Sequence, residues 1–438
     1  MKPLHRLMIS ALLLYSKISW SQNLTLHQAL SEALADSPKL QKAHSQMEQV
    51  SWKRVEASSG FLPTLTLTGT YLTNKEYMLT DIKFPGSPVT TSIPQILPTA
   101  IATLSAQWSI FDGFSSTRKY QAATYFETAA EKDFDWSRFQ TELEVVSNYY
   151  KALAAQTLKN VAEQNVRTLE DHLKDVTLYK SVGVSTNYDV LRVEVQVSEA
   201  RAELLNSADN ADVFRLKLSE SLGKEMDARP LSGELPVLNM SLVKNISANE
   251  INERSDVKAL QSRLEGMEKM SSAAASYLIP KLSIFGQYQY YNNINDDRDD
   301  RSAFRNAHSE GLQLTWNIFD GLISPARSAQ SIEEKYQAEK TLRIARLKAL
   351  ADLEFWKRKY IYFCTIYQSR QSDIGKSSES VRLAKAGRKA GTRTSTELLD
   401  SELELFKAKA GAINAQLGAI DALIQLQLAS GKKLYDFQ

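Results

Sequence analysis

The residues that could carry out chemistry in this chain form no catalytic or metal-binding pattern. Cys364 is the only cysteine, which excludes an intrachain disulfide and a paired-cysteine zinc site and leaves the role of a core thiol. No glycine-rich phosphate loop is present. The histidines are scattered, and none has metal-ligand spacing with a neighbour; they are His5, His27, His44, His172 and His308. We therefore expect no enzyme and no cofactor.

A run of charged residues at positions 296–301 reads Asp-Asp-Arg-Asp-Asp-Arg. Its carboxylates could bind a divalent cation, but alternating signs are more typical of a solvated loop. The whole chain has 53 basic and 51 acidic residues, a formal net charge of +2. This balance gives no field that would favour nucleic acid or an anionic membrane surface as a partner.

The first residues have the pattern of a secretory signal peptide. Lys2 and Arg6 precede an apolar run from Met8 to Tyr15, and small residues around Ser21 suit cleavage, so we assign residues 1–21 to the signal. The alternative is a buried N-terminal helix. No later stretch of about 18 apolar residues appears, so an exported chain that enters a membrane must do so as strands.

An internal repeat organises the rest of the chain. The sequence Trp-Ser-Ile-Phe-Asp-Gly begins at Trp108, and Trp-Asn-Ile-Phe-Asp-Gly begins 208 residues later at Trp316. The same offset relates Gly183 to Gly391. We expect a first repeat at 22–222, a linker at 223–245 and a second repeat at 246–438.

Each repeat is predicted to contain a short helix, a β-hairpin and two long helices. The hairpins are expected at 62–110 and 279–318, where apolar and polar residues alternate and proline opens the first strand. Long stretches with few glycines or prolines predict the helices. Their expected ranges are 114–182 and 186–222 in the first repeat, and 322–390 and 394–430 in the second.

One face of the four expected strands is apolar, as in strands that meet lipid, although a soluble sheet half-buried on a core alternates in the same way. Lipid allows no unpaired sheet edge, and four strands are too few to close a barrel. Three copies would supply twelve strands, so we predict a homotrimer. The apolar face consists of Leu65, Leu67, Leu104, Ala106, Trp108, Ile110, Leu282, Ile284, Leu312, Leu314, Trp316 and Ile318.

These features resemble the TolC family of outer-membrane efflux and secretion proteins over nearly the whole chain after the signal. The resemblance rests on the opening Leu-Thr-Leu at 24–26, the doubled Phe-Asp-Gly, and the two glycine turns after the first long helices. It implies a mainly α protein with transmembrane β-strands. In this fold, a homotrimeric twelve-stranded β-barrel, with four strands per protomer, continues into a long periplasmic α-helical barrel.

The resemblance also implies a function and partners. The chain is expected to be the outer-membrane channel of a tripartite efflux or type I secretion system, conducting passively. A periplasmic adaptor (membrane fusion) protein and an inner-membrane transporter of the RND, ABC or MFS type are the implied partners. The implied adaptor-docking turns contain Val182, Gly183, Ala390, Gly391 and Thr392.

Members of the family close their periplasmic tip around an acidic constriction, which implies a gate at the second turn. Glu397 and Asp400 lie three residues apart and share a helix face, so three copies of each would form two acidic rings that attract cations. Asp189 is the counterpart of Glu397 in the first repeat. We hypothesise that Arg393 pairs with Asp189 or with a neighbouring backbone carbonyl across the closed tip. The alternative is that these acids belong to solvated helix faces.

A second class of function stays open at this point. The same helices and hairpins could form a secreted or periplasmic coiled-coil interaction or adaptor protein, with the hairpins in a soluble sheet. Recovery of the protein in the soluble periplasmic fraction would favour this alternative.

Overall fold

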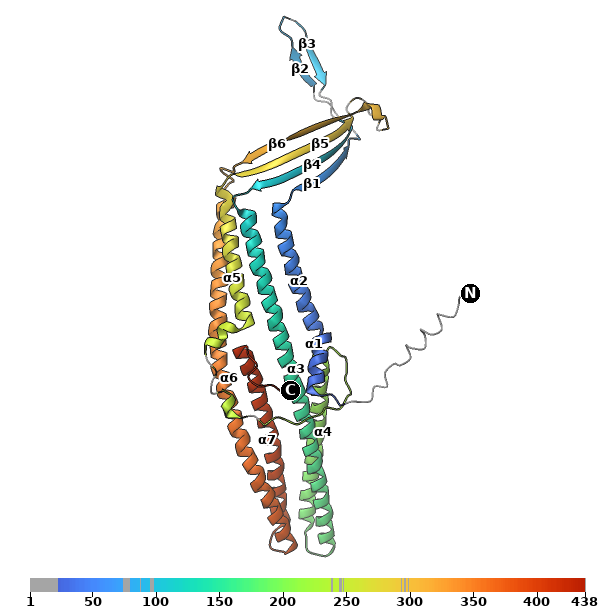
Figure 1. Cartoon of the computed structure of the whole chain (residues 1–438). Coiled ribbons are helices and arrows are strands. Elements are labelled where there is room, and N and C mark those ends of the chain that lie inside the picture. The colour runs from blue at the N-terminus through green and yellow to red at the C-terminus, as the bar shows by residue number, and fades with distance from the viewer. Residues whose placement is uncertain are drawn as a thin grey trace, which may run out of the picture. The chain divides into compact units, whose positions relative to one another are not determined.

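A computed structural model describes residues 23–73, 79–86, 88–94, 98–237, 239–243, 246, 248–292, 294, 297 and 299–437 (Figure 1). The predicted signal peptide therefore lies outside the described residues. The chain folds into two compact units. The strand-bearing unit comprises Gln46–Glu131 and Ala259–Arg343. The helical unit comprises the described residues up to Ser45, Lys132–Lys258, and the described residues from Ile344 on.

The strand-bearing unit contains one four-stranded antiparallel sheet, in the order β1-β4-β5-β6 (Figure 1). Its strands are β1 (Thr64–Tyr71), β4 (Ala100–Phe111), β5 (Lys281–Asn292) and β6 (Phe304–Thr315). Two hairpins from the two repeats thus lie side by side through the pairing of β4 with β5. Among the described residues, β1 and β6 each have an edge without a partner strand. A separate small hairpin, β2 (Leu79–Lys83) with β3 (Thr90–Pro94), lies between β1 and β4 in sequence.

The register places the apolar side chains of neighbouring strands opposite one another. Leu67 pairs with Leu104, and Ile284 pairs with Leu312. These side chains are exposed in the protomer, 74% for Leu67 and 68% for Leu312. Further along β6 the same face turns polar, because Glu310 and His308 follow at alternate positions. On β6 the leucine side chains of this face are therefore confined to the C-terminal half of the strand.

The second hairpin ends earlier than its predicted limit at residue 318. Strand β6 stops at Thr315, which pairs with Lys281, the first residue of β5. The residue before Lys281 is Pro280, which has no backbone N–H to extend the ladder. Trp316 and Ile318 follow the strand as exposed side chains.

The repeated Phe-Asp-Gly sequence forms the same strand-to-helix turn in both repeats. Asp112 Oδ2 accepts hydrogen bonds from Ser116 N at 2.7 Å and Ser116 Oγ at 2.6 Å, and Asp320 binds Ser324 in the same way. Gly113 has φ +71°, a left-handed conformation that glycine adopts without strain. These turns start the helices α3 (Ser115–Ser181) and α6 (Ile323–Lys389).

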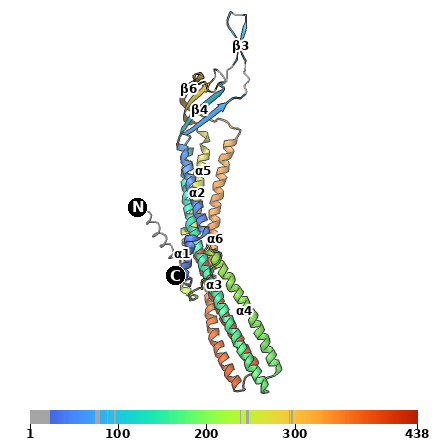
Figure 2. The ribbon, with the colours of Figure 1, turned by 90° about the vertical axis from the view of Figure 1, so that its right-hand side faces the viewer.

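Two long helical hairpins, α3/α4 and α6/α7, dominate the helical unit, and their turns lie at the same end of it (Figures 1 and 2). None of the helices found among the described residues is long and apolar enough to cross a membrane. The remaining α-helices are α1 (Leu26–Asp36), α2 (Pro38–Ser58), α4 (Asn187–Ser221), α5 (Ser255–Ala274) and α7 (Ser395–Ser430). Short 3₁₀ turns are η1 (Ser59–Phe61), η2 (Met240–Val243), η3 (Ala248–Glu253), η4 (Ala275–Leu278) and η5 (Arg301–Ala303).

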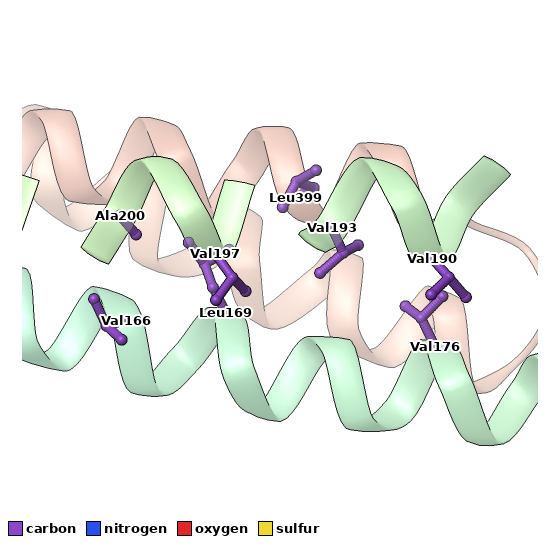
Figure 3. Close-up of a cluster of buried hydrophobic side chains, with 8 residues drawn as sticks. All are labelled: Val166, Leu169, Val176, Val190, Val193, Val197, Ala200 and Leu399. Carbon is purple, nitrogen blue, oxygen red and sulfur yellow. The ribbon is translucent and has the colours of Figure 1, made fainter. Parts of the chain in front are cut away.

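A cluster of aliphatic side chains holds α3, α4 and α7 together near the two turns (Figure 3). Seven of its eight members come from α3 and α4, and Leu399 is the contribution of α7. Their heptad-like spacing along α3 and α4 is that of a coiled-coil seam. The members are Val166, Leu169, Val176, Val190, Val193, Val197, Ala200 and Leu399.

The segment after α4 is fixed to the start of the chain by polar contacts. Leu24 forms an isolated parallel bridge with Leu231, and the Tyr149 hydroxyl donates to Leu24 O at 3.0 Å. Arg229 binds both Glu32 and Asp227, with its Nη2 2.7 Å from Glu32 Oε2. This network holds the pKa of Asp227 at about 2, chiefly through the hydrogen bond from Arg229.

Candidate functional site

The candidate site is the end of the helical unit where the two long hairpins turn. Residues 182–186 connect α3 to α4, and residues 390–394 connect α6 to α7. In the first turn Val184 N donates to Tyr179 O, and in the second Thr392 N donates to Gly387 O, both at 2.8 Å. Gly183 and Gly391 have φ +79° and +73°. Both turns therefore end their first helix with the glycine C-cap typical of the Schellman motif.

The predicted docking residues lie on the surface of these turns. Val182 is 66% exposed and its neighbour Val184 is 74% exposed, although both are aliphatic. Gly183, Ala390, Gly391 and Thr392 are exposed as well. The end of the first hairpin thus exposes the aliphatic side chains of Val182 and Val184.

Asp189 and Glu397 cap the N-termini of the second helices in each hairpin. Thr186 N donates to Asp189 Oδ2 at 2.9 Å, and Thr394 N donates to Glu397 Oε2 at 2.8 Å. The threonine hydroxyls accept from the backbone N–H of the acid in return, which completes a capping box in both hairpins. These backbone hydrogen bonds are the main reason that the pKa values of both carboxyls are lowered.

Sequence reasoning missed this structural role, although its signal is present. A threonine followed three residues later by an acid, just before a helix, is the sequence pattern of a capping box. Thr186 with Asp189 and Thr394 with Glu397 both fit it. The matching positions of the two acids in the repeat follow from their common capping role within the protomer.

The hypothesised contact of Arg393 with Asp189 or a carbonyl is not the one that the protomer forms. Arg393 Nη1 instead lies 3.1 Å from Glu397 Oε1. Arg393 and Glu397 are four residues apart at the N-terminus of α7, and this spacing brings their side chains to the same side of the helix. Asp189 is already bound by Thr186.

Asp400, on α7, forms an ion pair with Arg192 of the α3/α4 hairpin. Its Oδ1 lies 3.6 Å from Arg192 Nη2, and Arg192 Nη1 donates to Thr396 Oγ1 at 3.3 Å. Arg192 therefore joins α4 to α7, a role that no spacing in the sequence indicated. The side chains of this ion pair are 39% and 63% exposed, so the pair contributes roughly 0 to 1 kcal/mol.

A buried polar cluster lies between α3, α6 and α7 and was also missed. His172 Nδ1 is 3.0 Å from Glu402 Oε2, and its Nε2 is 3.0 Å from Ser395 Oγ and in contact with Arg388 Nη1. The side chains of His172 and Glu402 are 2% and 3% exposed. His172 lies between the core positions Leu169 and Val176, and this was the available sequence signal.

The part of the chain that the structure describes contains no group of three or more His, Cys, Asp or Glu residues placed to hold a metal ion. In the charged run at 296–301, Asp296 and Arg298 lie outside the described residues. Asp297 and Asp300 accept backbone hydrogen bonds from Asp299 and Ser302. Cys364 is buried, and burial raises the pKa of its thiol.

Comparison with known proteins identifies the family. The family model described as "Outer membrane efflux protein" matches twice, at residues 29–224 and 247–432. The pyoverdine export outer membrane protein OpmQ of Pseudomonas aeruginosa is 22% identical over 412 residues, covering 93% of this chain and 85% of OpmQ. The outer membrane protein TolC of Vibrio cholerae is 22% identical over 451 residues, covering 98% and 96%.

The fold agrees with this assignment. The structure of the outer-membrane channel OprN is similar with a TM-score of 0.78 and 19% identity, covering 93% of this chain and 90% of OprN. The two family matches coincide with the two repeats seen in the sequence. The chain belongs to the outer membrane efflux protein family, the family of TolC, and is an outer-membrane efflux protein with a helical portion in the periplasm.

Proposed function

We propose that three copies of this protein form one passive channel that carries substrate from a periplasmic adaptor and an inner-membrane pump to the exterior. The single observation that supports it most is the sheet, because β1 and β6 leave open edges beside an exposed apolar face. Lipid does not tolerate unpaired strand edges. Three protomers that pair β1 of one with β6 of the next close a twelve-stranded barrel without any free edge.

The apolar band defines which part of the sheet meets lipid. Leu65, Leu67, Leu312 and Leu314 are between 68% and 74% exposed in the protomer. Leucine side chains exposed in this way are stabilised by hydrocarbon, whereas a charged residue such as Glu310 is costly there. We place Glu310 at the outer boundary of the hydrocarbon, on the side of the β5–β6 connection.

The two turns of the helical unit form the periplasmic entrance in this proposal. Val182, Gly183, Ala390, Gly391 and Thr392 provide the surface for a periplasmic adaptor, and the exposed aliphatic side chain of Val182 supplies apolar contact area. The adaptor connects the channel to an inner-membrane transporter. We assign substrate selection to that transporter.

The gate is proposed at Glu397, Asp400, Arg393 and Asp189. Three copies of Glu397 and of Asp400 surround the lumen, and Arg393 offsets part of the charge through its contact with Glu397. The capping role of Glu397 keeps its carboxylate ionised, because hydrogen bonds from Thr394 lower its pKa. An ionised ring attracts multivalent cations and makes the entrance sensitive to their block.

Single-channel recordings in planar bilayers test the channel and the ring together. The wild type is expected to conduct and to be blocked by a multivalent cation added on the periplasmic side. The double variant E397Q/D400N should lose most of the block, since both acidic rings become neutral. The control D171N removes an exposed acid from α3, 75% exposed, and should leave the block unchanged. Absence of conductance in the wild type contradicts the channel, and unchanged block in the double variant contradicts the ring.

A further inference from the structure

A polar cluster of buried His172 and Glu402 with partly buried Arg388 and Ser395 joins the two helical hairpins. His172 is on α3, Arg388 is on α6, and Glu402 and Ser395 are on α7. Among the described residues, Arg388 Nη2 and Glu402 Oε1 are buried without a hydrogen-bond partner. A buried polar cluster with unsatisfied atoms costs stability compared with apolar packing, so packing alone does not explain its presence.

The contacts of His172 define its tautomer. The guanidinium of Arg388 only donates hydrogen bonds, so the Nε2 atom that it contacts must be the unprotonated, accepting nitrogen. The proton of the neutral ring then lies on Nδ1, which donates to Glu402 Oε2 at 3.0 Å. Neutral His172 thus accepts from α6 and donates to α7 at the same time.

Protonation of the ring breaks this arrangement on one side. An imidazolium carries N–H groups on both nitrogens, so Nε2 would direct a proton at the Arg388 guanidinium, a like charge in direct contact. The contact with Glu402 would survive or strengthen, because the ring and the carboxylate would carry opposite charges. The link between α3 and α6 is therefore the one that is lost.

The other charged groups around the cluster do not remove this conflict. Lys385 on α6 lies 3.5 Å from Glu402 Oε1 and adds positive charge. Tyr179 on α3 stacks on Arg388, with 5.3 Å from the guanidinium carbon to the ring centroid. The charge of Arg388 contributes to lowering the pKa of Asp189 on α4, but the main cause is hydrogen bonding from Thr186, which binds this carboxylate directly.

The turn of the first hairpin offers an internal comparison, because the residues that match Arg388 and Ser395 there are not bridged by a histidine. The positions that match Arg388 and Ser395 there are Lys180 and Asn187, and Lys180 Nζ donates directly to Asn187 Oδ1 at 2.8 Å. In the second repeat the corresponding pair is instead bridged by His172 Nε2 from the other hairpin. His172 therefore connects the two hairpins at the position where, in the first repeat, Lys180 and Asn187 bind each other within one hairpin.

We propose that His172 is a pH-responsive latch that holds α6 against α3, and that its protonation releases α6 and opens the periplasmic entrance. The latch rests on the proposed channel function and adds a regulatory input to it. Histidine side chains change charge between pH 5 and 8, a range that the periplasm of a bacterium meets when its surroundings acidify. His172 acts here as a positioning residue and touches no substrate.

The test is the open probability of purified channels in planar bilayers, measured from pH 8 to pH 5. The wild type should open more at pH 5, with about tenfold or more change in the open-to-closed ratio, as expected when a charged hydrogen bond is lost. H172Q keeps one donor and one acceptor but cannot become charged, so it should stay mostly closed at both pH values. H172A lacks the link and should be open at both.

A matched control and a second measurement keep the result unambiguous. H308Q removes an exposed histidine from β6 and should retain the full pH response of the wild type. A pH response in H172Q equal to that of the wild type overturns the latch. If no variant conducts at all, the proposed channel fails while the latch is still tested by hydrogen exchange. After correction for intrinsic rates, acidification should expose amides around Arg388 in the wild type and not in H172Q, and equal behaviour contradicts the latch.

Discussion

Replacing Leu399 with alanine should loosen the contact between α7 and the α3/α4 hairpin more than any single polar change near the tip. Leu399 is 4% exposed and is the member of the aliphatic cluster that α7 contributes (Figure 3). Its neighbours in the cluster include Val193, 1% exposed, on α4. The Leu399 side chain is therefore buried in this seam, and its truncation removes packing atoms from the cluster.

The expected magnitude follows from burial. A buried leucine truncated to alanine costs about 2 to 5 kcal/mol, because transfer free energy and packing are both lost. The nearby ion pair of Arg192 with Asp400 is partly exposed and contributes about 1 kcal/mol at most. Apolar packing is thus expected to dominate the stability of this contact.

Hydrogen exchange of the detergent-solubilised protein measures the effect locally. Since 1.4 kcal/mol corresponds to a factor of ten, a loss of about 2 kcal/mol lowers the protection of amides near Leu399 about thirtyfold. The control is L205A on α4, where the side chain is 74% exposed in the protomer. Equal loss of protection in L399A and in the Arg192→Gln variant would refute the reasoning that apolar packing dominates.

Three further predictions concern single residues. T394A removes the cap of α7 and should cost about 1 kcal/mol, seen as roughly fivefold faster exchange in the first turn of that helix. G113A should lower the yield of heat-resistant trimers, because the residue has φ +71° and a Cβ there would lie 2.9 Å from Ile279 Cβ. D227N should lower the melting temperature at pH 7 but much less near pH 2. The folded-state pKa of Asp227 is about 2 against 3.8, so its contribution is present above pH 3.8 and is lost as the pH falls through about 2.

Each of these changes has a matched comparison. T186A should produce the same local loosening at α4, because its capping box has the same geometry. G286A, at a strand position where a Cβ meets nothing within 4 Å, should leave the trimer yield unchanged. A difference between D227N and the wild type that stays constant from pH 7 to pH 2 would contradict the ion network as its cause.

The repeat made much of the architecture predictable from the sequence. The 208-residue offset between Trp108 and Trp316 aligned the two hairpins and the helices after them, and alternation along the strands indicated the apolar face. Continuing that alternation along β6 would also have found Glu310 and His308, where the leucine side chains of this face end. The alternation is read within one strand and the offset by comparing the two repeats, so both could be found without knowledge of tertiary contacts.

The candidate site was harder to predict, for a physical reason. His172 meets Glu402 and Arg192 meets Asp400, pairs that are more than 200 residues apart in the sequence. Which residues face each other depends on the axial register between two helical hairpins, and no pattern within one helix encodes that register. The capping acid Glu397 was locally recognisable, but the family resemblance drew attention to its charge and not to its hydrogen bonds.

The most direct test of the central claim is the subunit number of the purified protein from outer-membrane extracts, measured by native mass in mild detergent. The account predicts three copies per particle, because three sheets with open edges at β1 and β6 close one barrel. Disulfide pairs engineered between β1 and β6 should then form between chains and not within one. A detergent-independent, water-soluble monomer would contradict the account.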